Sequence, residues 1–233
     1  MRLNKFIAET GMCSRRQADA WIERGRITVN GRRVELGTQV EEGDQVRVNG
    51  RIIGSRKKKH IYIALNKPTG ITCTTDRQVS NNIIELIKHP QRIFPIGRLD
   101  KDSEGLILLT SDGDIVNEIL RSENDHEKEY IVTVDRPFTD EFISGMARGV
   151  RLPELHVVTK RCEVSRVNPR TFRIILTQGL NRQIRRMCEV FGYRVERLQR
   201  VRIMNIRLDR LKPGYWRDLK PGELRGLLPE KMK

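Results

Sequence analysis

The feature that most limits how this chain can fold is a polar loop between two short apolar runs. Phe94–Ile96 leads into the loop, and the β-prone run Leu106–Thr110 leads out of it. Runs of this length bounded by glycine are typical of buried strands, so the loop at Gly97–Gly105 is expected at the edge of a sheet. Loops on rigid strands often carry reacting side chains, and this stretch is therefore a candidate site.

Three acidic and two basic residues share this loop. If the loop is partly extended, Arg98, Asp100 and Asp102 face one side while Leu99 anchors the other. On the loop alone, solvated turn chemistry is the more common explanation of such a sequence. Asp102 and Glu104 are expected to cap the loop rather than to react.

The charge of the chain indicates a polyanionic partner. Its 233 residues include 45 Lys and Arg against 30 Asp and Glu, a formal net charge of +15. Nucleic acid is the expected partner. A basic membrane-surface protein is the competing interpretation, weakened because no long apolar stretch or strongly apolar amphipathic terminus appears. The N-terminus continues into a helical pattern without the apolar region of a signal peptide, so a cytoplasmic location is expected.

The cysteines are widely spaced and predict no disulfide framework or metal site. No C-x-x-C pair occurs, and the four histidines are equally dispersed, so the thiols are expected to be buried in a reducing compartment. The cysteines are Cys13, Cys73, Cys162 and Cys188.

Residues 1–48 are expected to form a separate small domain. An i, i+3, i+4 apolar spacing from Leu3 indicates a helix, and Ser14 with Gln17 forms a capping box that opens a second one. Asn30-Gly31 is a strong turn pattern for a hairpin.

Basic side chains occupy the positions that the apolar faces of this domain leave free. Their single sign favours contacts with phosphate over a merely solvated face. Leu3–Ala8, Ser14–Ala18 and Val29–Gly31 resemble the S4 RNA-binding domain, which implies a helical pair that binds structured RNA. The residues expected to contact RNA here are Arg2, Lys5, Arg15, Arg16 and Arg32.

The rest of the chain divides into a linker and a larger domain. Residues 49–60 contain two glycines and a cationic cluster and are expected to be a basic linker. In residues 61–233, strand-like and helical segments alternate over short links. This pattern predicts an α+β domain built on a largely antiparallel mixed sheet with flanking helices.

A second cluster of charge opens a predicted helix. Arg182, Arg185 and Arg186 gather at its start, where the helix dipole favours anions. A carboxylate or a phosphate is therefore expected nearby, although ordinary solvated arginines are the alternative.

Several stretches resemble the motifs of one enzyme family. The family is that of the pseudouridine synthases that include the ribosomal small-subunit enzyme A and the large-subunit enzymes B, E and F. Asn66–Gly70 resembles the motif that opens its catalytic domain. The stretches that resemble its three catalytic motifs, in the expected order, are Gly97–Leu106, Lys128–Tyr130 and Gly179–Met187.

The resemblance implies roles for particular residues. Asp100 would be the nucleophile or base that converts uridine to pseudouridine, Arg185 would pair with it, and Tyr130 would stack on the target base. Arg98 would fill the space vacated by an extruded base. Arg182 and Arg186 are further candidates for RNA contact. No cofactor is expected, because the reaction involves no redox change and no external group.

The substrate implied is ribosomal RNA, with a stem-loop of the large-subunit 23S RNA favoured and with pre-ribosomal particles and transfer RNA left open as partners. A monomer is expected. The alternative is a non-catalytic S4-type protein that binds ribosomal RNA or assists ribosome assembly. Charge and the first domain fit both, but a binder has no need of a carboxylate on a surface that faces phosphate.

Overall fold

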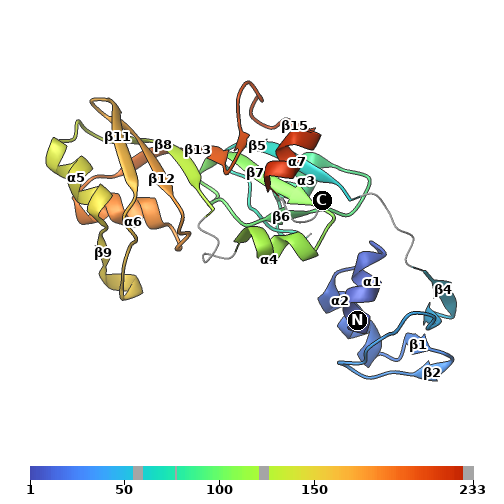
Figure 1. The fold of residues 1–233 in the computed structure, drawn as a ribbon. Helices are drawn as coiled ribbons and strands as arrows, with labels where there is room; N and C mark the ends of the chain where they lie inside the picture. Colours follow the sequence, from blue (N-terminus) through green and yellow to red (C-terminus); the bar gives the residue numbers. More distant parts are fainter. Residues whose placement is uncertain (55–59, 77, 121–125, 228–233) are drawn as a thin grey trace. The chain divides into compact units, whose positions relative to one another are not determined.

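The structure, a computed structural model, describes residues 1–54, 60–76, 78–120 and 126–227. The chain divides into two compact units, which are described separately (Figure 1). The first contains residues 1–60 together with the short segments 90–92 and 111–113, and the second contains the remainder.

The first unit packs two helices against a small antiparallel sheet. The capping box that the sequence predicts is present, because the Gln17 amide donates to Ser14 Oγ (3.1 Å) and the Ser14 amide donates to Gln17 Oε1 (2.8 Å). Asn30 and Gly31 have φ values of 51° and 76°, which a two-residue hairpin turn requires. The elements are α1 (Leu3–Glu9), α2 (Arg15–Glu23), β1 (Ile27–Val29), β2 (Arg32–Arg33), β3 (Val46–Val48) and β4 (Arg51–Ile53).

The strand β4 differs from the predicted linker. Arg51–Ile53 lie inside residues 49–60 but pair in antiparallel register with β3, so this part belongs to the sheet of the first unit. Asn49-Gly50 is the same turn pattern as Asn30-Gly31, with φ values of 49° and 76°, and the linker prediction overlooked this hairpin because of the cationic cluster that follows. The cationic residues 56–59 of the predicted linker lie outside the described residues.

The second unit is built on one large mixed sheet. Within the described residues it contains nine strands, seven of them in the order β11-β12-β8-β13-β7-β5-β15, with β6 paired to β7 and β14 to β13. The β13–β7 pair is parallel and the other pairs are antiparallel. The strands are β5 (Tyr62–Lys67), β6 (Phe94–Ile96), β7 (Glu104–Thr110), β8 (Lys128–Val134), β11 (Glu163–Asn168), β12 (Thr171–Leu176), β13 (Val195–Ile203), β14 (Ile206–Arg207) and β15 (Trp216–Asp218).

Helices cover both faces of this sheet, and β7 shows why. Ile107 and Leu109 belong to one apolar cluster, whereas Leu106 and Leu108 belong to the other. A strand buried on both faces has an unbroken apolar sequence instead of an alternating one. The helices are α3 (Ile83–Ile87), α4 (Asp114–Leu120), α5 (Asp140–Arg148), α6 (Gln183–Val190) and α7 (Pro221–Leu227), and a small pair β9 (Arg151–Leu152) and β10 (Val157–Val158) lies beside them.

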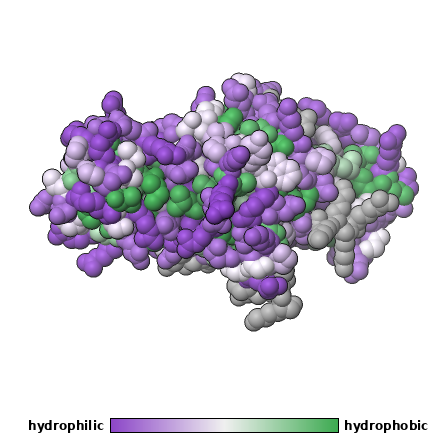
Figure 2. Space-filling model, turned by 90° about the horizontal axis from the view of Figure 1, so that it is seen from above, coloured by the Kyte–Doolittle hydropathy of each residue, from purple (hydrophilic) through white to green (hydrophobic). Residues whose placement is uncertain are grey.

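The two apolar clusters have separate helical covers. α3, α5 and α6 supply side chains to the cluster that contains Val132 and Phe172, and α4 and α7 supply them to the cluster that contains Leu106. Figure 2 shows mainly hydrophilic residues on the visible face, with apolar residues in small separate patches. In the described part of the chain, no helix has the length and apolar character needed to cross a bilayer.

A buried carboxylate joins three neighbouring strands on the face opposite Tyr130. Glu129 of β8 accepts from Arg173 Nε on β12 and from Arg202 Nε on β13, both at 2.7 Å. The Arg173 hydrogen bond lowers the pKa of Glu129; burial raises it by less, and the bond from Arg202 lowers it further, so the pKa lies below its ordinary value of 4.5. This trio holds β8 between the strands that flank it.

We expect Glu129→Gln to lower the free energy of unfolding by about 2–3 kcal/mol at neutral pH, because Arg173 and Arg202 lose their nearest and most buried anionic partner and keep only Glu163 and Glu127. A group whose pKa is depressed by folding stabilises the protein above its ordinary value, and that stabilisation disappears as the pH falls through the lowered pKa. The difference between wild type and variant should therefore shrink below pH 4.5. Urea unfolding across this range measures it.

Glu163→Gln is the matched control. Glu163 also faces Arg173, at 3.9 Å, but its side chain is 72% exposed, so its removal should change stability by less than about 1 kcal/mol. Equal effects from the two variants would contradict the role given to Glu129.

Candidate active site

The loop between β6 and β7 is held in place by a buried side chain and by several hydrogen bonds. Leu99 is buried, and its amide donates to Cys73 Sγ (3.4 Å). The Ser103 amide donates to the Asp100 carbonyl (3.1 Å), and the Gly70 amide donates to the Lys101 carbonyl (2.8 Å). The loop is thus held on the sheet, with the Asp100 side chain 35% exposed.

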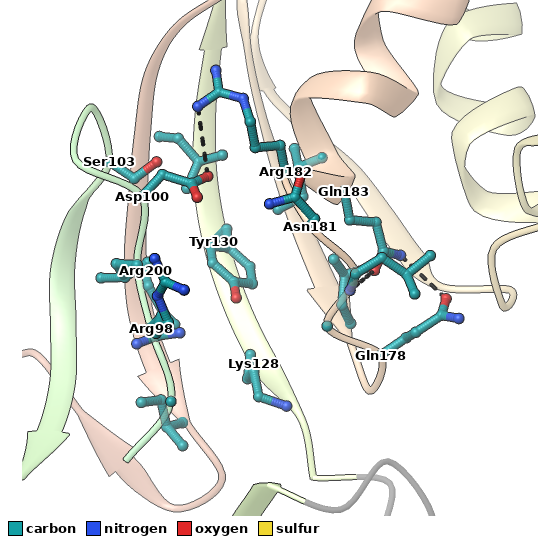
Figure 3. Close-up of a pocket in the computed structure, with 18 of the residues that line it drawn as sticks. Arg98, Asp100, Ser103, Lys128, Tyr130, Gln178, Asn181, Arg182, Gln183 and Arg200 are labelled. Carbon is teal, nitrogen blue, oxygen red and sulfur yellow. Dashed lines mark hydrogen bonds and ion pairs between the residues drawn. The ribbon is translucent and has the colours of Figure 1, made fainter. Parts of the chain in front are cut away.

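A cavity of about 690 Å³ opens beside this loop, entirely within the second unit. Its walls come from the β6–β7 loop, from β8 and β13, and from the start of α6 (Figure 3). Asp100, Tyr130 and Arg185, which the sequence places far apart, all line it. Arg98 and Arg182 line it as well.

Tyr130 stands on the cavity face of β8. It is 9% exposed and belongs to the same apolar cluster as Val132, two residues along the strand. Lys128 is two residues before it and also lines the cavity. The period of two along a strand places these side chains on one face and Glu129 on the other.

Arg185 does not form the ion pair with Asp100 that the family resemblance implies. Its Nη2 lies 3.4 Å from Asp102 Oδ2 and donates to the Asp102 carbonyl (3.0 Å) and to Ser103 Oγ (3.2 Å), while Nη1 donates to the Val195 carbonyl (3.2 Å). Among the described residues, the ion pair of Asp100 is with Arg182, at 4.0 Å. Two carboxylates two residues apart on one loop cannot be assigned to their arginines from sequence alone.

Asp102 is the carboxylate that the arginine-rich start of α6 requires. Arg182 Nη1 and Nη2 donate to its two oxygens, both at 3.2 Å. Burial raises the pKa of Asp102, but the hydrogen bonds from Arg182 and the charge of Arg185 outweigh burial, so its pKa lies below 3.8. This carboxylate compensates the cations at a helix end that disfavours them.

The two carboxylates predicted to cap the loop pair with arginines outside it. Asp102 binds Arg182 and Arg185, and Glu104 Oε1 accepts from Arg197 Nε (2.7 Å) on β13. Both carboxylates therefore join the loop to other segments, a long-range pairing that turn propensities do not describe.

The predicted RNA-binding arginines fall into two groups. Arg182 and Arg186 lie near the cavity and have carboxylate partners, Asp102 and Glu154 respectively. The others belong to the first unit, and four of them are exposed: Arg2, Arg15, Arg16 and Arg32. The fifth, Lys5, forms an ion pair in which its Nζ lies 3.6 Å from Glu9 Oε1.

Three basic residues that line the cavity were not predicted as site residues, namely Lys128, Lys160 and Arg200. Lys128 Nζ donates to the His126 carbonyl (3.0 Å), and burial, with the charge of Arg200, lowers its pKa. Arg200 is 4% exposed, and its Nε donates to the Leu106 carbonyl (2.7 Å). The sequence suggests only a basic stripe around Arg200, because it does not reveal that this stripe is a central strand.

The motif Asn66–Gly70 has a structural explanation. Lys67 is fully buried, and its Nζ donates to the carbonyls of Pro68 (2.9 Å) and Ile71 (3.0 Å). Burial lowers the pKa of Lys67, and the nearby carboxylates of Asp102 and Asp100 oppose that shift. Lys67 thereby fixes the turn whose Gly70 binds the site loop.

No group of three or more His, Cys, Asp and Glu side chains among the described residues could hold a metal ion. The four cysteines are free thiols, and burial raises the pKa of Cys188 to about 12 and that of Cys162 to about 11.

This fold and this cavity are those of an RNA-modifying enzyme, and the comparisons with known proteins agree. The family model described as RNA pseudouridylate synthase matches residues 61–190, and the S4 domain model matches residues 1–46. The chain belongs to the RNA pseudouridylate synthase family. It is an RNA pseudouridine synthase, an isomerase, rather than a non-catalytic binding protein.

Particular relatives sharpen this assignment. The chain is 57% identical to the dual-specificity RNA pseudouridine synthase RluF of Escherichia coli K12, over 96% of this chain and 77% of that protein. It is 35% identical to the ribosomal large subunit pseudouridine synthase B of Bacillus subtilis, over 97% and 95% of the two chains. A crystal structure described as a pseudouridylate synthase is 29% identical, covers 97% of this chain and 99% of its own, and has a TM-score of 0.72.

Proposed function

We propose that the protein isomerises a specific uridine of ribosomal RNA, within 23S RNA, and that Asp100 is the reacting carboxylate. The observation that carries this proposal is the meeting of Asp100 and Tyr130 in one open cavity whose remaining charged walls are cationic. A carboxylate on a phosphate-facing surface would weaken RNA binding, so its presence calls for a chemical role.

The chemistry needs few groups. The C1′–N1 bond of the uridine breaks, the uracil turns, and C5 bonds to C1′. An ionised carboxylate can act as a nucleophile or a base in this sequence. Asp100 is partly exposed, so its carboxylate is open to the cavity, and it lies 4.0 Å from the guanidinium of Arg182.

Tyr130 and Arg98 have complementary roles in this proposal. A base inside folded RNA must leave its stack before reaction, at a cost of a few kcal/mol. The ring of Tyr130, set on a rigid strand, would stack on the extruded uracil. Arg98 is exposed at the rim of the cavity and would fill the space that the base vacates.

Arg185 would act as a positioning residue. Its contacts reach the carboxylate and the carbonyl of Asp102 and the hydroxyl of Ser103, so it fixes the loop that carries Asp100 from the core side. Arg182 would fix the same loop from the solvent side through Asp102. The two arginines share the role that the family resemblance gives to one.

The choice of 23S RNA rests on the relatives, one of which is named for the large ribosomal subunit and another as dual-specific. The test is a carbodiimide-based map of pseudouridine in ribosomal and transfer RNA from cells with and without the gene. A pseudouridine of 23S RNA should disappear and return when the gene is restored. Loss only in 16S or transfer RNA would overturn the target, and no change in any RNA would overturn the function.

The exposed arginines of α2 supply RNA affinity in this proposal. We expect Arg15→Gln with Arg16→Gln to weaken binding and to reduce the slope of log K against log salt by about 1.8, since each phosphate contact contributes about 0.9. Filter binding of the mapped stem-loop at several salt concentrations measures this change.

A matched control removes the same charge elsewhere. Arg166→Gln with Arg170→Gln affects two arginines that are already paired with Asp140 and Glu196 in the second unit. An equal loss of slope in the control pair would show a general charge effect and contradict a specific contact by α2. We further propose that the protein acts in the cytoplasm. We also propose that it acts as a monomer, and light scattering of the protein–RNA complex measures its oligomeric state.

A further inference from the structure

Arg200 carries an unexplained donor in the cavity. Its Nε donates to the Leu106 carbonyl, but its Nη2 is buried and has no hydrogen-bond partner among the described residues. No carboxylate of the described chain lies within ion-pair distance of it. Because a buried cation without an anion is costly, an unpaired guanidinium that lines a substrate cavity suggests a ligand atom.

The register of the sheet places this guanidinium beside the proposed stacking ring. Arg200 of β13 is directly opposite Tyr130 of β8, and opposite residues of neighbouring antiparallel strands project to the same face. Lys128 lies two residues from Tyr130 on that face, and its charge and that of Arg200 act on each other. Figure 3 shows Arg200 beside the Tyr130 ring and Lys128 further along the same strand as Tyr130.

Depth in the cavity separates Arg200 from the groups that would meet the RNA backbone. Arg98 is exposed and the Asp100 side chain is 35% exposed, whereas Arg200 is 4% exposed. When a nucleotide leaves its stack and enters a pocket, the base goes deepest and its phosphates stay at the rim. The atoms that reach Arg200 are therefore those of the base edge.

We propose that Arg200, with Lys128 beside it, binds a carbonyl oxygen of the uracil and stabilises the negative charge that the base acquires during the reaction. This inference rests on the proposed function. When the C1′–N1 bond breaks, its electron pair remains on the uracil and is shared between N1, O2 and O4. The C5–C1′ bond then forms with an electron pair of the ring, C5 loses its proton, and N1 gains one, so the base is neutral again.

A donor fixed in advance by the protein suits this task. The Nε of Arg200 is held by the Leu106 carbonyl and its backbone by both neighbouring strands, so the guanidinium is positioned before the substrate binds. Such preorganised donors affect the transition state more than the bound substrate. Arg200 would therefore contribute to rate far more than to RNA affinity.

The variant Arg200→Gln tests this role with little structural change. The amide nitrogen of glutamine occupies the same place along the side chain as the arginine Nε, so the donor to Leu106 is kept while the charge and both Nη groups are lost. We expect the single-turnover rate on the mapped stem-loop to fall by about 10²–10³-fold, with RNA affinity nearly unchanged. Arg202→Gln, on the same strand but paired with Glu127 and Glu129, is the control and should lower stability with little loss of rate.

A substrate with 5-fluorouridine at the target position separates charge stabilisation from positioning. Fluorine withdraws electrons and stabilises the uracil anion by itself, so consumption of this nucleoside should depend less on Arg200 than consumption of uridine does. Equal slowing of the two substrates by Arg200→Gln, or a rate on uridine within about threefold of wild type, would overturn the inference. A wild-type protein that forms no pseudouridine in any RNA would instead overturn the proposed function itself.

Discussion

Asp100→Asn should lower pseudouridine formation by at least about 10⁴-fold, the scale seen when an enzyme loses its reacting group. Asparagine keeps the shape and the acceptor oxygen of the side chain but cannot act as an anionic nucleophile or as a base. The loop should keep its place, because its fastenings run through Leu99, Ser103 and Asp102 rather than through the Asp100 carboxylate. Single-turnover assays on the mapped stem-loop measure the loss.

RNA binding should survive in the same variant and become slightly tighter, since one negative charge leaves a surface that faces phosphate. Asp140→Asn is the matched control. It removes a carboxylate of the same unit that is 92% exposed and paired with Arg166, and its rate should equal that of wild type. Retention of more than about one tenth of the wild-type rate by Asp100→Asn would exclude this residue as the reacting carboxylate.

Short sequence patterns predicted correctly those parts of the fold that depend on interactions between residues close together in the sequence. The capping box of Ser14 and Gln17 and the turn at Asn30-Gly31 depend on a few neighbouring residues, and both are present. The two-sided burial of β7 follows from its continuous apolar run. The α+β fold with a largely antiparallel sheet is confirmed as well.

Long-range pairing could not be predicted in the same way. β13 is a central strand with arginines at 197, 200 and 202, and each of them has a partner from another strand. A sequence with this much charge is typical of a solvated surface, so neither the strand nor the cavity role of Arg200 was predicted. The distribution of Arg182 and Arg185 between Asp100 and Asp102 likewise depends on how the loop meets α6.

Gly105 shows how strictly this meeting of loop and strand is specified. It has a φ of 105° and pairs with Arg200 where β7 and β13 run parallel. A Cβ atom at this position would lie 2.3 Å from the Arg200 carbonyl oxygen and 2.7 Å from its nitrogen. Both are backbone atoms in the middle of a sheet and cannot move aside without breaking the pairing.

Gly105→Ala should therefore lower the free energy of unfolding of the second unit by at least about 3 kcal/mol, from backbone strain and forced separation of two strands together. Urea unfolding followed by circular dichroism measures the loss, and hydrogen exchange should show it first in the amides of β7 and β13. Gly179→Ala is the control, because a Cβ there would meet no atom within 4 Å and its φ is not positive. If both glycine variants were equally stable, the close approach of β13 to the site loop would be wrong, and with it the position of Arg200 beside the reacting base.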